Sequence, residues 1–225
     1  ENGVDDEVPP PLLYITECVP YDARPAWPKP SAIKSRGCSD CHLKPKTHEC
    51  HFGCACASSR ELCARRKLAA GIAKELAVFR TPSKGWGVRT QEKIREGEFV
   101  CEYVGELISS EEAERRAVTC PESDQYILEI AGASAHGSRV AIDAYAIRNV
   151  AAFINFSCRP NLEMVGVDGT HGDRRFSRVA FFARKDIPIG TELGYRRDPN
   201  SKVARDPNAR IRCYCGAGDL CKGYI

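Results

Sequence analysis

Apolar residues occur in short runs along most of the chain's second half, separated by polar or glycine-rich stretches. Runs rich in β-branched and aromatic residues predict strands. They cover residues 12–16, 99–104, 125–130, 139–143 and 177–184. Short strands joined by loops are typical of a mainly β fold with few and short helices.

One segment carries strong helix signals. Ser109 and Glu112 form a capping box before an alanine- and arginine-rich stretch, and Cys120-Pro121 predicts the end of that helix. Residues 145–154 predict a second, short helix. Leu, Ile and Leu recur at helical spacing across 68–76, which leaves the structure of that segment open.

Two stretches have the composition of surface segments. The prolines between residues 25 and 30 predict an extended chain. Residues 196–210 contain Arg-Asp-Pro-Asn twice, a turn-forming sequence without core residues, and we expect a loop whose charges face solvent.

Length and composition narrow the class of protein. The chain has 225 residues, enough for one substantial core and a smaller module. A formal net charge of +3 does not by itself indicate nucleic-acid binding. We expect no membrane span, because 18 consecutive apolar residues never occur. We expect no secretion signal, because the N-terminus lacks the apolar h-region of a signal peptide. The closely spaced 13 cysteines favour metal ligation over disulfides, and therefore a reducing, intracellular compartment.

Residues 38–63 hold a dense cysteine cluster. A segment of this composition cannot build a hydrophobic core, so bound metal must supply its folding energy. Two tetrahedral zinc ions need eight ligand positions, and six thiolates fill them when two of the thiolates bridge. The expected ligands are Cys38, Cys41, Cys50, Cys54, Cys56 and Cys63. As an alternative, His42, His48 or His51 could serve as terminal ligands.

A second metal site combines distant parts of the chain. The apolar run before Asn155 ends in a polar loop that contains Cys158, and the C-terminus offers Cys213, Cys215 and Cys221. Together the four cysteines complete a closed tetrahedral zinc site. Asn155-Phe156-Ser157 also fits the N-glycosylation pattern, but glycosylation requires secretion, which the cysteine spacing argues against.

These motifs together resemble the SET domain, the fold of protein-lysine methyltransferases. Residues 152–161 follow the family's Arg-Phe-[Ile/Val]-Asn-His-Ser-Cys-x-Pro-Asn except at Ala152 and Phe156. The other matching motifs are Gly85-Trp86-Gly87-Val88-Arg89, Glu102-Tyr103-Val104-Gly105-Glu106, Gly190-Thr191-Glu192-Leu193 and the cysteine tail. The resemblance implies small sheets around a pseudoknot-like core and a strand at 76–80.

It also implies three parts: an N-terminal segment with a pre-SET zinc module (1–75), the SET domain (76–198), and a loop with a post-SET zinc segment (199–225). Residues 10–17, 109–116 and 178–183 look similar to the heterochromatin, Su(var)-type methyltransferases in particular.

The resemblance assigns a cofactor and a reaction. S-adenosylmethionine would donate a methyl group to a lysine amine inside a narrow, water-excluding channel with aromatic walls. Tyr103 and Tyr195 are the expected catalytic residues. The cofactor would lie against Lys84, Gly85, Trp86, Tyr126, Asn155 and Phe156.

The sequence departs from the family pattern at three places, all in the parts of the chain where the cofactor and the catalytic residues are expected. Ala152 replaces the usual arginine and Phe156 the usual histidine. The usual Glu-Leu-[Thr/Ser]-[Phe/Tyr]-Asp-Tyr is Glu-Leu-Gly-Tyr-Arg-Arg here, so that Arg197 stands at the catalytic tyrosine in an ungapped alignment. A two-residue shortening would instead make Tyr195 the catalytic hydroxyl. We favour Tyr195, with Arg197 turned outward.

The leading interpretation is therefore a nuclear, chromatin-bound histone-lysine methyltransferase. Its expected substrate is the ninth residue of the histone H3 tail, with other chromatin proteins as further partners, and without sequence-specific nucleic-acid binding. The alternative is a non-catalytic SET module that binds chromatin or a partner protein, which Ala152 and Arg197 favour. A purely structural zinc protein explains the cysteines but not the Gly-Trp-Gly turn.

Overall fold

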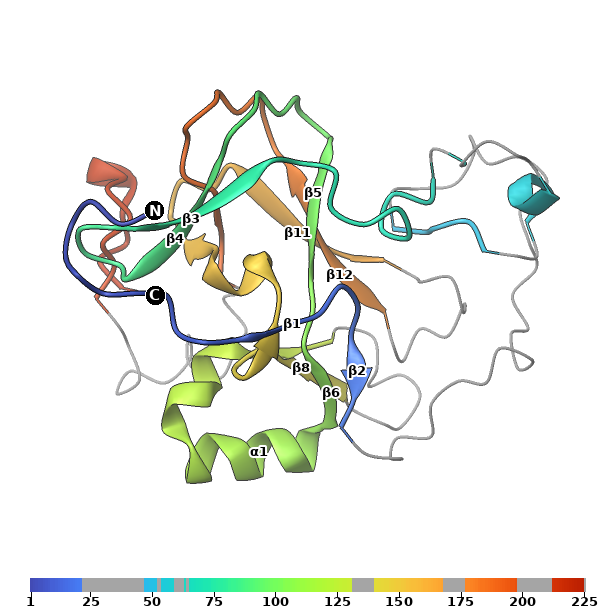
Figure 1. The fold of residues 1–225 in the computed structure, drawn as a ribbon, viewed down its shortest axis with the longest axis horizontal. Helices are drawn as coiled ribbons and strands as arrows, with labels where there is room; N and C mark the ends of the chain where they lie inside the picture. Colours follow the sequence, from blue (N-terminus) through green and yellow to red (C-terminus); the bar gives the residue numbers. More distant parts are fainter. Residues whose placement is uncertain are drawn as a thin grey trace.

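The computed structural model describes residues 1–21, 47–51, 54–58, 63, 65–130, 140–167, 177–197 and 212–224, and these form a mainly β fold (Figure 1). The strands are β1 (Leu13–Tyr14), β2 (Val19–Pro20), β3 (Leu76–Arg80), β4 (Trp86–Thr90), β5 (Phe99–Tyr103), β6 (Glu106–Ser109), β7 (Ile127–Glu129), β8 (Val140–Asp143), β9 (Ile147–Arg148), β10 (Asn155–Phe156), β11 (Leu162–Val167), β12 (Arg178–Ala183) and β13 (Gly194–Tyr195). The described α-helix is α1 (Ser110–Thr119), and short 3-10 turns occur at Ala55–Ser58, Pro121–Tyr126, Val150–Phe153 and Gly218–Leu220. In the described part of the chain, no helix is long and apolar enough to cross a bilayer.

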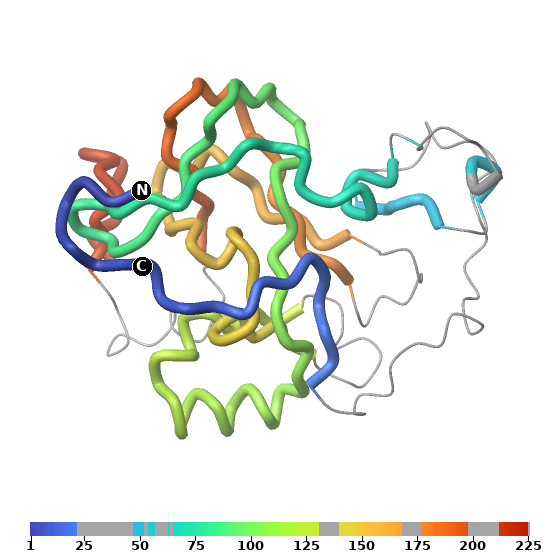
Figure 2. Tube along the Cα trace, viewed as in Figure 1, coloured from blue at the N-terminus to red at the C-terminus, as the bar shows by residue number. Residues whose placement is uncertain are grey.

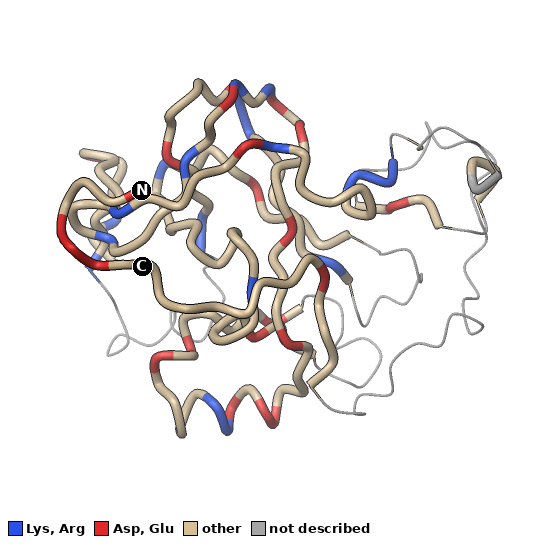
Figure 3. Tube along the Cα trace, in the orientation of Figure 1, with Lys and Arg blue, Asp and Glu red and all other residues tan. Residues whose placement is uncertain are grey.

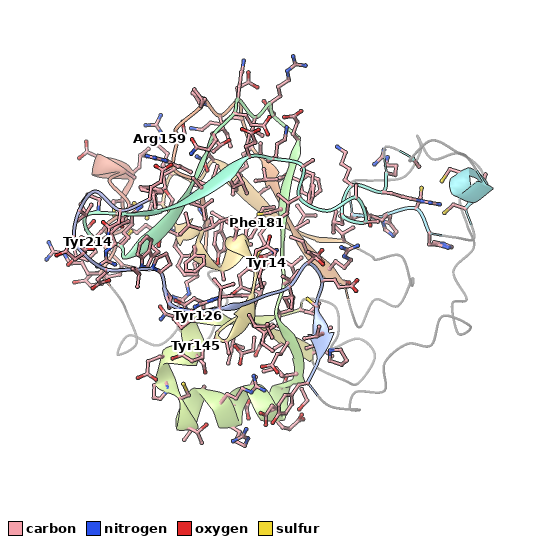
Figure 4. All side chains as sticks on the ribbon, in the orientation of Figure 1. Tyr14, Tyr126, Tyr145, Arg159, Phe181 and Tyr214 are labelled. Carbon is pink, nitrogen blue, oxygen red and sulfur yellow. The ribbon has the colours of Figure 1, made fainter. Side chains whose placement is uncertain are left out.

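Small sheets pack around one central core. β11, β12 and β5 form an antiparallel sheet, and β6 lies between β2 and β8 in a second sheet that ends at β7. β3 and β4 form an antiparallel pair, and β3 confirms the strand that the resemblance implied at 76–80. Every residue of β5 is buried, and Phe181 of β12 lies in the middle of the molecule (Figure 4). Four of the five β5 residues are hydrophobic, and the fifth, Glu102, is buried with them.

The helix α1 begins where its capping residue predicts. The Ser109 hydroxyl accepts a hydrogen bond from the Glu112 amide at 3.2 Å. The Glu112 carboxylate binds Arg115 and Arg116 within the same helix, and these bonds lower its pKa to about 2. Cys120 ends the helix, and the 3-10 turn follows directly from Pro121.

Two predictions of local structure need correction. Residues 145–154 form strand β9 and a 3-10 turn, not a helix, because β9 pairs with β1 through a bond from the Ile15 amide to the Arg148 carbonyl. The strand expected from residue 125 begins at Ile127, since Pro121–Tyr126 remains in a 3-10 turn. The segment left open, 68–76, has a turn through residue 70 and then β3.

A parallel contact between distant strands closes the core. β10 and β13 pair so that Asn155 faces Gly194 and Phe156 faces Tyr195. The Asn161 side chain secures the same contact, since its amide donates to the Glu192 carbonyl and its oxygen accepts from the Gly194 amide, both at 2.8 Å. This threading of β13 beside the 155–161 loop brings together residues that lie far apart in sequence.

The described cysteine-rich segment and the C-terminal tail lie at opposite ends of the molecule's long axis (Figure 2). Positive and negative side chains are interspersed along the described trace (Figure 3), which matches the nearly balanced composition.

Candidate functional site: an aromatic cavity and a tetrahedral cysteine site

A cavity of about 440 Å³ opens between the turn before β4, the strands β10 and β13, and the C-terminal tail. All six residues predicted to contact the cofactor line it, and so do both predicted catalytic tyrosines. They are Lys84, Gly85, Trp86, Tyr126, Asn155, Phe156, Tyr103 and Tyr195. Residues from five separate stretches of the chain thus meet at one site.

Glu192 holds the polar wall of this cavity together. Both of its carboxylate oxygens accept from the Lys84 ammonium at 2.7 Å, and one accepts from the Asn155 amide at 3.2 Å. The Asn155 amide also donates to the Trp86 carbonyl at 3.1 Å. A Cβ on Gly87 would lie 2.9 Å from the nearest atom, so this close approach requires glycine.

Two tyrosines form the inner end of the cavity. The Tyr103 hydroxyl donates to the Tyr126 carbonyl at 2.8 Å. The Tyr195 ring packs 4.8 Å from both Phe156 and Phe181, measured between centroids. Burial raises the pKa of Tyr103 and of Tyr195, so both phenols stay protonated. They can therefore orient a polar group through hydrogen bonds while remaining neutral.

Arg197 does not turn outward, contrary to the expectation. It lines the cavity with its guanidinium carbon 4.8 Å from the Phe156 ring. One terminal nitrogen is buried, and no described residue forms a hydrogen bond with it. Because Tyr195 and Arg197 are two positions apart on an extended segment, both side chains reach the same side of the chain.

Phe156 is half-buried and packs against the main core, as expected for a side chain that cannot hydrogen-bond within its loop. Ala152, the other departure near it, also lines the cavity.

Arg148 is a residue that the sequence reasoning did not single out. Its guanidinium is buried and stacks on Tyr126 and Phe153 at 5.1 and 5.0 Å. Two of its nitrogens have no hydrogen-bond partner in the described part of the chain. An arginine inside the mostly apolar run 146–154 was the signal that could have drawn attention to it.

The second predicted zinc site has the geometry that zinc needs. The sulfur atoms of Cys158, Cys213, Cys215 and Cys221 all lie within 4.8 Å of one another. The sulfurs of Cys158 and Cys213 are 3.8 Å apart. Zinc–sulfur bonds of about 2.3 Å in a tetrahedron place sulfurs about 3.8 Å apart, so this donor set fits one zinc ion. The tail that it fixes carries Cys213 and Tyr214 against the cavity.

The N-terminal cluster is described only in part. The sulfurs of Cys50, Cys56 and Cys63 lie within 4.8 Å of one another, and Cys54 is buried nearby, accepting from the His51 amide. Cys38, Cys41 and His42 lie outside the described residues. Among the described residues the metal-binding groups contain cysteines alone, without His48 or His51. No described cysteine is in a disulfide.

Comparison with known proteins identifies the family. Residues 85–196 match the SET domain model. The chain is 33% identical over 254 residues to the H3 lysine-9 specific histone-lysine N-methyltransferase SUVH5 of Arabidopsis thaliana, a match that covers all of this chain and 30% of the relative. It is 34% identical to dim-5 of Neurospora crassa, covering 79% of this chain and 58% of that protein.

Solved structures agree with these relatives. The Neurospora DIM-5 SET-domain protein superposes with a TM-score of 0.74 at 26% identity, over 95% of this chain and 97% of that chain. Arabidopsis SUVH6 in complex with S-adenosylmethionine gives 0.73 at 31% identity, over 99% of this chain and 52% of that one. The chain belongs to the SET-domain family, its relatives are of the Su(var) type, and the predicted SET fold is confirmed. It spans about a third of the length of SUVH5 and of SUVH6.

The matched residues lie inside the segment predicted as the SET domain. The boundaries at 75/76 and 198/199 stay predictions.

Proposed function

We propose that this chain transfers a methyl group from S-adenosylmethionine to a lysine of the histone H3 tail, the ninth residue being the expected target, in the nucleus. The observation that carries the proposal is the single cavity lined by every residue predicted for cofactor and for catalysis. The relatives named as H3 lysine-9 specific methyltransferases support the choice of substrate.

The residues of the chain suit this reaction in three ways. The aromatic rings of Trp86, Tyr126 and Phe156 provide rigid walls that exclude water and attract a cation. The phenols of Tyr103 and Tyr195 are neutral, so they can accept a hydrogen bond from an incoming amine and orient its lone pair. The bound cofactor would supply the methyl group and the leaving thioether.

The histone partner is proposed on structural analogy. One solved relative, KRYPTONITE, was determined with DNA, an H3(1-15) peptide and S-adenosylhomocysteine, and it resembles this chain with a TM-score of 0.74 at 29% identity. An extended tail can bind by adding a strand to a sheet edge. Sequence-specific binding of nucleic acid and membrane attachment are not part of the proposal.

Transfer of labelled methyl groups to an H3 peptide tests the proposal directly. We expect incorporation into a peptide that carries lysine at the ninth position and background incorporation when that lysine is replaced by alanine. Equal labelling of both peptides would reject the substrate assignment. If neither peptide is labelled and calorimetry detects no binding of S-adenosylmethionine, the proposal that the chain is a methyltransferase is rejected.

A second function is favoured by one specific observation, the Arg197 guanidinium inside the cavity. A permanent cation there opposes entry of a charged lysine. A non-catalytic module that binds the histone tail without modifying it would fit this arrangement. Peptide binding without methyl transfer, at saturating cofactor, distinguishes it from the enzyme.

A further inference from the structure

The charge of the aromatic cavity is unbalanced. Among the described residues that line it, Lys84, Arg197 and Arg212 are cationic and none is Asp or Glu. Lys84 is neutralised by Glu192, at 2.7 Å from both carboxylate oxygens. Arg212 is exposed, and its guanidinium carbon lies 5.4 Å from the centroid of the Tyr214 ring. Among the described lining residues, Arg197 is therefore the cation whose charge no neighbouring carboxylate compensates.

The surroundings of Arg197 support this view. One guanidinium nitrogen is buried and has no hydrogen-bond partner among the described residues. The guanidinium carbon lies over the Phe156 ring, 4.8 Å from its centroid. Asp124 acts on Arg197 only at a distance, and no ion pair joins the two in the described part of the chain. An arginine keeps its proton under all working conditions, so the positive charge is permanent.

We propose that Arg197 determines which charge form of the cofactor the cavity prefers. A guanidinium close to the bound sulfur repels the sulfonium of S-adenosylmethionine but leaves the neutral thioether of S-adenosylhomocysteine nearly unaffected. The cavity then binds the demethylated form more tightly. This inference rests on the proposed function, because it takes the cavity to be the cofactor site.

The size of the effect follows from Coulomb's law. Two unit charges several ångströms apart in a partly buried site repel enough to change affinity by about tenfold or more. The Phe156 ring attracts both the guanidinium and the sulfonium, so the two cations also compete for the same aromatic face.

Calorimetric titration of the full, zinc-loaded chain with each cofactor form tests the inference. We expect wild type to bind S-adenosylhomocysteine about tenfold more tightly than S-adenosylmethionine. Arg197→Met should raise the affinity for S-adenosylmethionine about tenfold while changing that for S-adenosylhomocysteine less than about threefold. Arg197→Lys keeps the charge and should keep the preference.

Arg184→Met is the matched control, because it removes an arginine at an exposed position outside the cavity lining. It should leave both affinities unchanged. Thermal melting of each variant verifies folding, and Arg197→Lys still tests the role of the charge if Arg197→Met fails to fold.

The outcomes separate this inference from the proposed function. Binding of both forms with equal affinity in wild type, or a preference that survives in Arg197→Met, overturns the role of Arg197 and leaves the methyltransferase proposal intact. Binding of neither form, in wild type and in Arg197→Met alike, overturns both, since the cavity is then not a cofactor site.

Discussion

Tyr195 and Arg197 occupy the same cavity, and their positions there are set by strand pairing. Tyr195 faces Phe156 across the β10–β13 pair, with its ring packed between Phe156 and Phe181. Arg197 follows two residues later, and its guanidinium carbon lies 4.8 Å from the centroid of the Phe156 ring. The neutral phenol of Tyr195 and the permanent cation of Arg197 therefore line the same small cavity.

Replacing Tyr195 by phenylalanine should reduce methyl transfer by about one to two orders of magnitude. The phenol is the neutral group placed to orient an amine, and losing one positioned polar group has an effect of this size. Initial rates with labelled cofactor and H3 peptide measure it. Arg197→Tyr is the informative companion variant: labelling by Arg197→Tyr but none by wild type would mean that the chain has lost its activity.

Phe156→His should not restore tight cofactor binding by itself. Phe156 is held by packing against Tyr195 and by the guanidinium of Arg197, and a histidine in its place leaves that cation in the cavity. Calorimetry should show a change in S-adenosylmethionine affinity of less than about threefold. An increase of tenfold or more in S-adenosylmethionine affinity would instead show that Phe156, and not Arg197, weakens cofactor binding.

At the scale of elements, one arginine connects the cysteine-rich segment to the central sheet. Arg178 of β12 donates to the Glu102 carboxylate in β5, to Glu49 at 3.4 Å, and to the Leu68 carbonyl at 3.2 Å. The Leu68 amide in turn donates to Glu49 at 2.6 Å. Burial raises the pKa of both Glu49 and Glu102, despite their shared arginine.

Arg178→Met should destabilise the fold by about 3–5 kcal/mol near neutral pH, because two buried carboxylates lose their counter-ion. The folded pKa values of Glu49 and Glu102 lie above their unfolded values. Their contribution to stability is therefore largest below about pH 4.5 and decreases as pH rises through the folded pKa.

The decrease in the free energy of unfolding that Arg178→Met causes should accordingly be larger at pH 8 than at pH 5. Urea unfolding of wild type and variant at both pH values measures the difference. Arg184→Met, just beyond the same strand and exposed, should change stability by less than about 0.5 kcal/mol at either pH. An equal decrease in stability for Arg178→Met at the two pH values would contradict the role of Arg178 as the counter-ion of Glu49 and Glu102.

At the scale of the whole molecule, metal sites stand at its two ends and only one adjoins the cavity. Cys213, a member of the C-terminal set, lines the cavity, whereas the lining includes no described residue of the 47–63 cluster. We expect three zinc ions per chain, two in the N-terminal cluster and one at the C-terminal site. Native mass spectrometry against the denatured mass counts them.

Cys221→Ser should remove one zinc ion and weaken S-adenosylhomocysteine binding by about tenfold or more, because the tail loses the metal that folds it. Cys56→Ser is the matched control, because Cys56 belongs to the other group of cysteines. The described cysteine-rich segment lies at the end of the molecule opposite the C-terminal tail (Figure 2). Cys56→Ser should disturb metal binding in the N-terminal cluster and leave the affinity for S-adenosylhomocysteine within about threefold of the wild-type value. A single zinc ion in the wild-type chain would contradict the scheme.

The sequence by itself determined the features that depend on neighbours along the chain. The start of α1 follows from the Ser109 cap, and the strands β5, β8 and β12 lie in the runs that predicted them. Cysteine spacing predicted the four-sulfur site, because few ligand combinations complete a tetrahedron. The strand β3 and the residues assigned to cofactor and catalysis came from the family resemblance, and the structure shows that those assigned residues line one cavity.

Only the tertiary structure decided that Arg197 lines the cavity and that Arg148 is buried against two aromatic rings. It also decided that Arg178 contacts both Glu49 and Glu102. Residues 145–154 have local helix signals, yet pairing with β1 makes their first part a strand. Each of these outcomes depends on partners distant in sequence. Local propensity amounts to less than about 1 kcal/mol per residue, so long-range pairing and burial override it.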